Sequence, residues 1–250
     1  PIGFQGRELT MSVFNAFAPL VHFGALQTIG AELDRELLAI MAEPYALGRL
    51  LGGTELQGYS GIFIDVGGGT TDIALVIDGG VVATKMFNLG GKSFTKRLAQ
   101  ALNISMDEAE EVKTAFSDGQ LEQQSHKIVS RAIESDIEVW TSGVYLTLKE
   151  ISEVDSFPPT IYLSGGASML NEIKVDLEQS DWYKKLNFPR KPQVKYMLPK
   201  NISHIKDLSG KLQSPADIVP MALANIGMEL ISEEKILTKM LQKVVRLMQV

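Results

Sequence analysis

The chain has 250 residues, of which 45% are apolar and 22% charged, with a formal net charge of −6 and no cysteine. This length can bury a sizeable core in one large domain or two modest ones, and the composition is ordinary for a globular protein. The lack of cysteine excludes disulfides, thiolate metal sites and cysteine nucleophiles, and the negative charge weighs against nucleic-acid binding.

The N-terminal part of the chain is apolar but does not resemble a membrane span. Residues 9–31 carry no formal charge and are long enough to cross a bilayer. Polar residues such as Asn15 and Gln27 are costly at a membrane centre, so we expect a strand and a helix instead. The elements predicted here are the strand Glu8–Ala18, the helix Phe23–Asp34, the short strand Leu37–Met41 and the helix Pro44–Leu51.

After a glycine-containing loop at residues 52–58, strands alternate with helices, which indicates an α/β architecture. The predicted strands are Ser60–Val66, Asp72–Ile77, Val81–Asn88, Thr160–Leu163 and Gln193–Met197. The predicted helices are Ser93–Leu102, a helix capped by Ser105 with Glu108 three residues later, Leu121–Ile151, Met169–Glu178, Ala216–Leu230 and Ile231–Val250.

The most informative motif lies between the first two strands of this series. Asp65 ends one apolar run, Gly67, Gly68, Gly69, Thr70 and Thr71 follow, and Asp72 opens the next run. Glycines let backbone N–H groups approach a ligand, threonine hydroxyls add donors, and aspartates can hold a cation directly or through water. The pattern therefore predicts a hairpin that binds phosphate and a metal ion. A hairpin that only turns the chain is the alternative.

Two commoner phosphate motifs are excluded. A Rossmann fingerprint would place a third glycine where Asp72 stands, and it would open a helix rather than a strand. The segment Gly91-Lys92-Ser93 resembles the end of a P-loop, but Met86 occupies the position of the first P-loop glycine.

Three further places are candidate parts of a site. At Ser164-Gly165-Gly166-Ala167 a strand runs into two glycines, which fits close approach of a ligand or an ordinary turn. Glu110 and Lys113 share a helix face at a spacing of three, which by itself predicts no more than an ion pair. Glu43 stands before a helix that begins with proline, where it either orients a water molecule for catalysis or stabilises the helix start.

Five motifs in order resemble one family. The glycine-threonine hairpin, Glu43-Pro44, Leu89-Gly90-Gly91 with Phe94-Thr95, Ala109 to Lys113, and Leu163 to Ala167 are similar in order and spacing to the superfamily of actin, sugar kinases and large heat-shock chaperones. Within it, the chain resembles the bacterial cell-division family FtsA. The resemblance implies an actin-like (ribonuclease H-like) ATPase fold in the α/β class, with the second lobe complete and the first lobe partial.

The resemblance also implies a division into domains. Residues 1–57 would be the remainder of the first lobe, with part of the subdomain that the family inserts there. Residues 58–230 would be the second, nucleotide-binding lobe, and residues 231–250 a C-terminal amphipathic helix. Because the family's first phosphate loop is missing from this sequence, we expect a fragment without the N-terminal part; a natural start at Pro1 is the alternative.

By the same resemblance the ligands are ATP and Mg²⁺. Asp65 and Asp72 would hold the cation, with Asp65 and Glu43 as catalytic residues, and residues 67–71 would hold the phosphates. Glu110 and Lys113 would bind the ribose, and Gly165, Gly166 and Ala167 the adenosine. Gly90-Gly91 would close the phosphate region or simply allow a tight turn from strand to helix, and contact with the nucleotide is a further possibility. Glu111 is expected to be a surface residue.

The C-terminal segment has different chemistry. Residues 235–250 contain no acidic residue, and their apolar positions fall on one helical stripe. Such a helix suits a membrane surface, as in the FtsA family, but the absence of a flexible linker before it also fits packing on the core.

The function implied by the resemblance is an ATP-binding scaffold of cell division. It would act in the cytoplasm, peripherally on the inner face of the membrane, with FtsZ-type filament proteins and its own copies as partners. It would be at most a slow ATPase, and this segment alone would bind ATP weakly and hydrolyse it negligibly. The alternatives are a non-hydrolysing adaptor like the pilus-assembly protein PilM and, less favoured, a small-molecule kinase of the same superfamily.

Overall fold

The computed structural model describes residues 15, 17–52, 60–202 and 205–231. The chain divides into two compact units, residues 1–40 and residues 41–250. Among the described residues, no helix combines the length and the apolar character that a membrane crossing requires.

The first unit contains one described helix, α1 (Leu20–Glu32), which begins three residues before the predicted start. It ends in a Schellman motif, because Asp34 adopts a left-handed conformation and Arg35 N donates to Gly30 O at 2.9 Å. Most of the predicted strand Glu8–Ala18 lies outside the described residues, and Asn15, Phe17 and Ala18 are in no strand.

The predicted strand Leu37–Met41 is wrong, since residues 35–42 have no regular structure. A strand needs a neighbouring strand for its hydrogen bonds, and none of the described strands pairs with this segment.

The second unit is built on a five-stranded mixed sheet with the order β3-β2-β1-β4-β5. The strands are β1 (Gly61–Val66), β2 (Thr71–Ile77), β3 (Gly80–Phe87), β4 (Thr160–Ser164) and β5 (Gln193–Tyr196). β1, β2 and β3 form antiparallel pairs, whereas β4 pairs in parallel with both β1 and β5. All five lie within one residue of their predicted bounds at each end.

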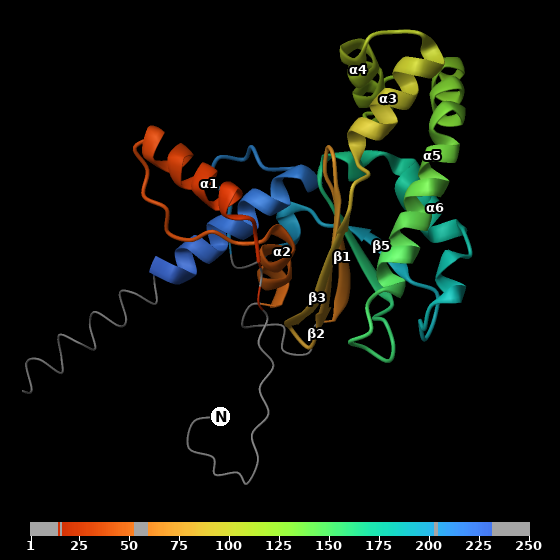
Figure 1. The fold of residues 1–250 in the computed structure, drawn as a ribbon. Helices are drawn as coiled ribbons and strands as arrows, with labels where there is room; N and C mark the ends of the chain where they lie inside the picture. The colour runs from red at the N-terminus through yellow and green to blue at the C-terminus, as the bar shows by residue number, and fades with distance from the viewer. Residues whose placement is uncertain (1–14, 16, 53–59, 203–204, 232–250) are drawn as a thin grey trace, which may run out of the picture. The chain divides into compact units, whose positions relative to one another are not determined.

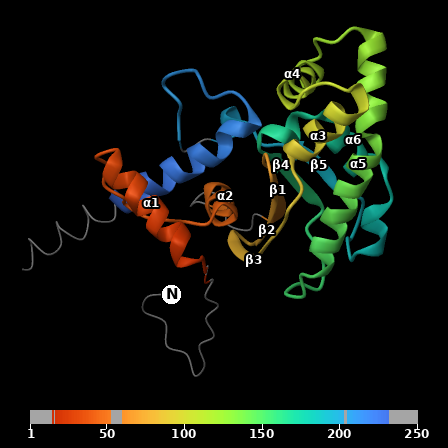
Figure 2. The same cartoon turned by 45° about the horizontal axis from the view of Figure 1, so that its top comes forward.

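Helices cover both faces of this sheet (Figures 1 and 2). On one face lie α2 (Glu43–Gly52) and the helix at residues 218–231. On the other lie α3 (Gly91–Leu102), α4 (Met106–Ser117), α5 (Gln123–Lys149) and α6 (Asn171–Gln179). α3, α4 and the first half of α5 continue beyond the end of the strands (Figure 1).

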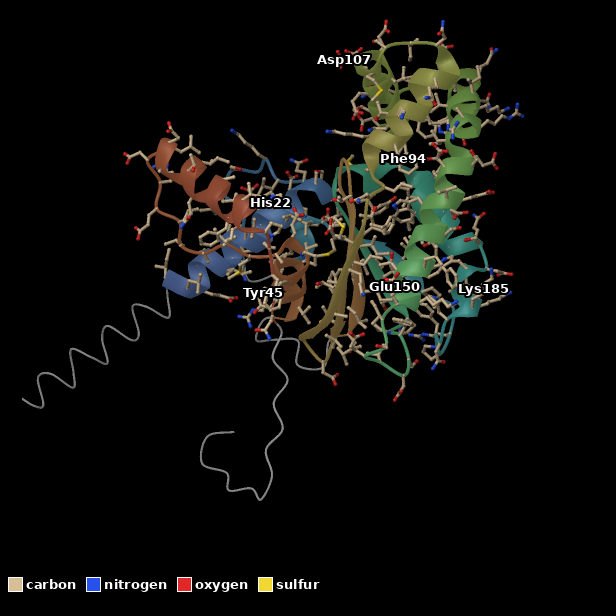
Figure 3. The ribbon with its side chains drawn as sticks, viewed as in Figure 1. His22, Tyr45, Phe94, Asp107, Glu150 and Lys185 are labelled. Carbon is tan, nitrogen blue, oxygen red and sulfur yellow. The ribbon has the colours of Figure 1, made fainter. Side chains whose placement is uncertain are left out.

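Strand alternation explains why the sheet has a core on each face. Ile62, Ile64 and Val66 of β1 are fully buried on the side of α3 and α5, together with Phe94 and Trp140. The intervening Phe63 is fully buried on the opposite face, where α2 packs. Figure 3 shows Phe94 at the end of α3 that meets the sheet. Because β1 is buried on both faces, polar residues at its end are held in a fixed frame.

Local signals set several element boundaries. Ser105 Oγ accepts from Glu108 N, and Glu108 Oε2 accepts from Ser105 N, so the predicted capping box starts α4. Asp78 and Gly79 both have positive φ and form a two-residue turn between β2 and β3, so Gly80, which the sequence assigns to the turn Asp78-Gly79-Gly80, already belongs to β3.

The predicted helix Met169–Glu178 is wrong at its start. A short 3₁₀ helix, η1 (Gly166–Met169), comes first, and extended backbone at Leu170 separates it from α6. Leu170 is 1% exposed, so burial of its side chain in the core accompanies the break. The predicted helix Ala216–Leu230 likewise begins as a 3₁₀ turn, η4 (Pro215–Asp217). The predicted terminal helix Ile231–Val250 lies outside the described residues, apart from Ile231.

The packing of α2 on the sheet yields a stability prediction. Gly48 lies inside α2, where alanine should favour the helix by about 1 kcal/mol. However, an added Cβ would lie 2.5 Å from Val81 Cγ2. We therefore expect Gly48→Ala to destabilise the chain by about 1–3 kcal/mol in urea unfolding. In a Val81→Ala background the same substitution should lower the free energy of unfolding much less. An equal loss of stability in both backgrounds would show that contact with Val81 is not the cause.

Candidate functional site

The glycine-threonine segment forms a tight hairpin tip between β1 and β2. Gly67 N donates to Thr70 O at 3.0 Å, which leaves Gly68 and Gly69 as the two tip residues. In the antiparallel register Asp65 lies directly opposite Asp72. The two carboxylates therefore belong to neighbouring strands and share one face of the sheet. A cation site shared by both aspartates, as predicted from the motif, needs this arrangement.

The hairpin tip is held from outside by the start of α3. Gly91 N donates to Gly67 O at 2.9 Å, and Lys92 N donates to Gly68 O at 2.7 Å. A Cβ on Gly90 would lie 2.6 Å from Gly67 O, so only glycine fits there. Gly90-Gly91 thus lets α3 approach the hairpin tip, and Gly91 also lines the cavity described below. The first N–H groups of α3 are used for this purpose rather than for a ligand.

Gly69 has no structural reason to be glycine. Its φ is not positive, and an added Cβ would find nothing within 4 Å. At Gly68 the nearest atom would be Lys92 Cε, at an ordinary 3.8 Å. The protein therefore leaves open space in front of two side-chain-free residues, which is the arrangement a ligand needs to approach the backbone.

The two threonines of the motif differ. The Thr71 hydroxyl donates to Leu89 O at 2.7 Å and accepts from Trp140 Nε1 at 2.8 Å. Thr71 is fully buried, so the prediction that its hydroxyl is a ligand donor is wrong: strand alternation turns it into the core. Its backbone stays part of the proposed phosphate site. The Thr70 hydroxyl instead donates to Asp72 Oδ2 at 3.1 Å.

Asp65 is almost buried and is held by the turn after β4. It is 6% exposed, and Ser164 Oγ donates to its Oδ2 at 2.7 Å. Gly165 has φ +85°, and a Cβ there would lie 2.8 Å from Asp65 Oδ1 and 2.5 Å from Val66 O. Gly165 is thus required by packing against β1 whether or not a ligand binds. Burial raises the pKa of Asp65 above its ordinary value; the Ser164 hydrogen bond opposes this rise, and the Asp72 charge adds to it.

Glu43, Asp65 and Asp72 form an electrostatically coupled group. Burial raises the pKa of Asp72, against a hydrogen bond from Thr70. Glu43, in the first turn of α2, has a pKa raised by partial desolvation and then by the charges of Asp65 and Asp72. The described residues contain no group of three acidic or histidine side chains close enough to ligate a metal ion together.

Glu110 and Lys113 are paired, as their spacing predicts, and the pair is part of a larger network. Lys113 Nζ donates to Glu110 Oε2 at 2.7 Å, to Thr95 Oγ1 at 2.8 Å and to Gly91 O at 3.2 Å. Thr95 Oγ1 also donates to Glu110 Oε2 at 2.5 Å. Burial acts to raise the pKa of Glu110, but the bonds from Lys113 and Thr95 outweigh it and lower that pKa. Glu110 is therefore held as a carboxylate, and both of these hydrogen bonds use Oε2 rather than Oε1.

One cavity of about 310 Å³ brings the separate motifs together. It is lined by the hairpin tip, the start of α3, one face of α4 and the turn after β4: Gly67, Gly68, Gly91, Glu110, Lys113, Thr114, Ser117, Asp118, Gly166, Ala167, Met169 and Leu170. Gly91 lies where they meet, since a Cβ there would lie 3.0 Å from Ala167 Cβ and 3.4 Å from Lys113 Nζ. Gly166 resembles Gly69, because its Cβ would meet only Ala216 Cβ, at 4.0 Å.

Sequence reasoning missed several residues of this site. It gave no role to Ser164, which holds Asp65, or to Thr95, which holds Glu110, although both lie inside motifs that it quoted. The position of Ser164 and Thr95 inside these motifs was the sequence signal that could have identified them. Trp140, which fixes Thr71 from α5, carries no signal in the sequence, because the contact spans 69 positions.

The raised pKa of Asp65 gives a pH-dependent prediction. A raised carboxyl pKa means that the folded chain binds more protons than the unfolded chain, so the contribution to stability is full below the unfolded pKa and is lost as pH rises through the folded pKa. Asparagine does not ionise and can still accept from Ser164. Asp65→Asn should therefore raise the free energy of unfolding at about pH 7, and the gain should shrink toward about pH 4. Urea unfolding at the two pH values tests this; lower stability of the variant at neutral pH would contradict it.

Comparisons with known proteins identify the family of this chain. A family model described as "Cell division protein FtsA" matches residues 62–222, more than half of the chain. The cell division protein FtsA of Neisseria meningitidis serogroup B is 26% identical over 196 residues. That match covers 69% of this chain and 47% of the relative, so the chain spans about half the length of that curated protein.

Solved structures show the same fold at lower identity. The PilM-PilN type IV pilus biogenesis complex matches with a TM-score of 0.59 and 22% identity, over 82% of this chain and 57% of that chain. MreB5 of Spiroplasma citri bound to AMPPNP matches with a TM-score of 0.57 and 16% identity, over 87% of this chain and 67% of that chain. The sheet, its helices and the hairpin site thus form an actin-like ATPase fold, and the chain belongs to the FtsA family of cell-division proteins.

Proposed function

We propose that this chain binds ATP with Mg²⁺ at the cavity between the β1–β2 hairpin, α4 and the turn after β4. The observation that carries the proposal is the convergence of three sequence motifs on one cavity of about 310 Å³, although they lie up to about a hundred residues apart. Three glycine-containing turns in contact are unusual for packing alone, and Gly68, Gly69 and Gly166 have no protein atom closer than 3.8 Å to an added Cβ.

The phosphates would lie against the hairpin tip. The N–H groups of Gly68, Gly69 and Thr70 are the candidate donors, since Gly67 N already donates to Thr70 O. The carbonyls of Gly67 and Gly68 accept from α3, which fixes the orientation of the tip. A backbone whose N–H groups face a ligand and which is already rigid loses little entropy on binding phosphate.

Mg²⁺ fits the carboxylates beside the phosphates. Burial raises the pKa values of Asp65, Asp72 and Glu43, and the aspartate charges raise those of Asp65 and Glu43 further, so a cation would relieve their repulsion. Bound Mg²⁺ would supply positive charge against the polyphosphate, with Asp65 and Asp72 holding it mainly through its waters. Glu43 would either orient a water molecule toward the terminal phosphate or serve only as a negative charge at the start of α2.

The nucleoside would occupy the other end of the cavity. Glu110 would accept from the ribose hydroxyls, and Gly165, Gly166 and Ala167 would lie along the adenosine, with Met169 and Leu170 as apolar walls. Lys113 belongs to the same ribose end.

We place this nucleotide site within a cell-division scaffold. As in the family, residues 58–230 would be the second actin-like lobe, and residues 1–57 the remainder of the first. α2 nevertheless packs on the sheet of residues 41–250. The chain would self-associate, bind FtsZ-type filament proteins and meet the inner face of the membrane through residues 235–250, which lie outside the described residues. Lobe closure on ATP would bias these contacts.

Slow turnover suits such a scaffold better than rapid hydrolysis, so "ATP-binding" is the proposed activity and hydrolysis a minor one. The PilM-like adaptor remains the second candidate because the fold comparison includes that complex. The intact glycine-threonine hairpin and the open space at Gly69 favour ATP binding.

The central test is calorimetric titration with magnesium ATP, on the 250-residue chain and on the natural gene product. Gly69→Ala should unfold at the same temperature as the wild type, because its Cβ has no protein neighbour, yet it should bind ATP at least about tenfold more weakly. Asp65→Ala should remove the dependence of binding on Mg²⁺. Absence of binding by the wild-type gene product would reject the proposal and favour the adaptor.

The ribose contact has its own matched control. Glu110→Gln should weaken ATP binding by about tenfold through loss of a charged acceptor, whereas Glu111→Gln, one position along on the exposed side of α4, should not. Dideoxy-ATP, which lacks both ribose hydroxyls, should bind wild type more weakly than ATP does, and Glu110→Gln should abolish this preference. Equal preference in both proteins would exclude Glu110 as the ribose acceptor.

A further inference from the structure

Hydrogen-bond counting at Lys113 shows that this lysine is fully used by the protein. Its ammonium group has three donors, and it donates to Gly91 O, Thr95 Oγ1 and Glu110 Oε2. Its side chain is only 10% exposed, and its charge is paired with Glu110. Lys113 therefore holds Glu110 in place, and it cannot also donate to a phosphate without breaking one of these bonds.

The remaining charges of the site are negative. Glu43, Asp65 and Asp72 surround the base of the hairpin, and Asp118 lines the cavity. Among the described residues that line the cavity, Lys113 is the one cation. A negatively charged polyphosphate would thus enter a region where the protein is also negatively charged. A metal ion bound by the carboxylates would offset only part of the resulting repulsion.

Lys92 lies where a compensating cation is needed. Its backbone N–H already joins α3 to the hairpin tip through Gly68 O, at 2.7 Å. Its side chain runs along the tip, because a Cβ on Gly68 would lie 3.8 Å from Lys92 Cε. Lys92 is exposed and forms no ion pair or side-chain hydrogen bond with any residue that the structure describes. Its positive charge also helps to lower the pKa of Glu110, after the larger effects of burial, Lys113 and Thr95, so Lys92 lies within electrostatic reach of that carboxylate.

We infer that Lys92 binds the phosphate groups of the nucleotide, as a mobile point charge that lies over the hairpin tip, while Lys113 only positions Glu110. This inference rests on the proposed function, because it names the cation of the same ATP site. A lysine can provide the charge of a P-loop lysine from an unrelated backbone: here it stands at the start of α3 and faces a β-hairpin. An ammonium group in solvent can also move toward an arriving ligand at a low cost in free energy.

The test compares two lysines of α3. Lys92→Gln and Lys96→Gln both remove an exposed positive charge one turn apart, but only Lys92 lies beside the hairpin tip. Calorimetry with magnesium ATP, magnesium ADP and adenosine should show that Lys92→Gln weakens ATP and ADP binding by about tenfold and leaves adenosine unchanged. Lys96→Gln should leave all three unchanged, and Lys92→Arg should keep most of the ATP affinity. The difference in ATP affinity between Lys92→Gln and the wild type should become smaller as the salt concentration is raised.

The outcomes separate the two proposals. If the wild type binds no ATP, the proposed function fails and the inference fails with it. If the wild type binds ATP and Lys92→Gln matches Lys96→Gln within about twofold, the site stands and the role of Lys92 is rejected. Equal weakening of adenosine would also reject it, since that would indicate a structural effect rather than a phosphate contact. Circular dichroism of each variant confirms that the fold is retained.

Discussion

The site depends on the two hydrogen bonds that the first turn of α3 donates to the tip of the β1–β2 hairpin. Gly91 and Lys92 use their N–H groups on the carbonyls of Gly67 and Gly68. Since these carbonyls point toward α3, the tip has a defined orientation, and its open side faces the cavity. Gly90 makes the contact possible, because a Cβ there would collide with the tip. The glycines at 90 and 91 therefore bring a helix against a hairpin, whereas no such close contact requires the glycines at 68 and 69.

The same frame concentrates negative charge. β1 is buried on both faces, so Asp65 at its end cannot move away from Asp72 on the neighbouring strand. Ser164 satisfies one oxygen of Asp65 but adds no positive charge. The raised pKa values of the three carboxylates are the physical expression of this arrangement. Because the backbone here is rigid and the carboxylates repel one another, the proposed cation would bind with little reorganisation.

At the other end of the cavity, around Glu110, a positive charge balances the negative one. Glu110 receives bonds from Lys113 and Thr95, which hold it as a carboxylate at low cost. Both partners also attach to the region of Gly91: Lys113 donates to its carbonyl, and Thr95 lies one turn further along α3. The Glu110 carboxylate on α4 and the hairpin tip are thus both held by hydrogen bonds at the start of α3. A shift of that helix would move both ends of the cavity together.

The sequence by itself determined the elements and most of the candidate residues. Apolar runs located five strands, Ser105 with Glu108 located the start of α4, and Asp78-Gly79-Gly80 located a hairpin turn, because these signals act over a few residues. The strand Leu37–Met41 failed because apolar composition cannot supply a pairing partner. Tertiary structure alone decided that Thr71 faces Trp140 rather than a ligand, that Lys113 has no donor to spare, and that Gly165 is required by Asp65 while Gly69 is not. Each of these depends on contacts between segments far apart in the chain, where side-chain geometry rather than local propensity sets the outcome.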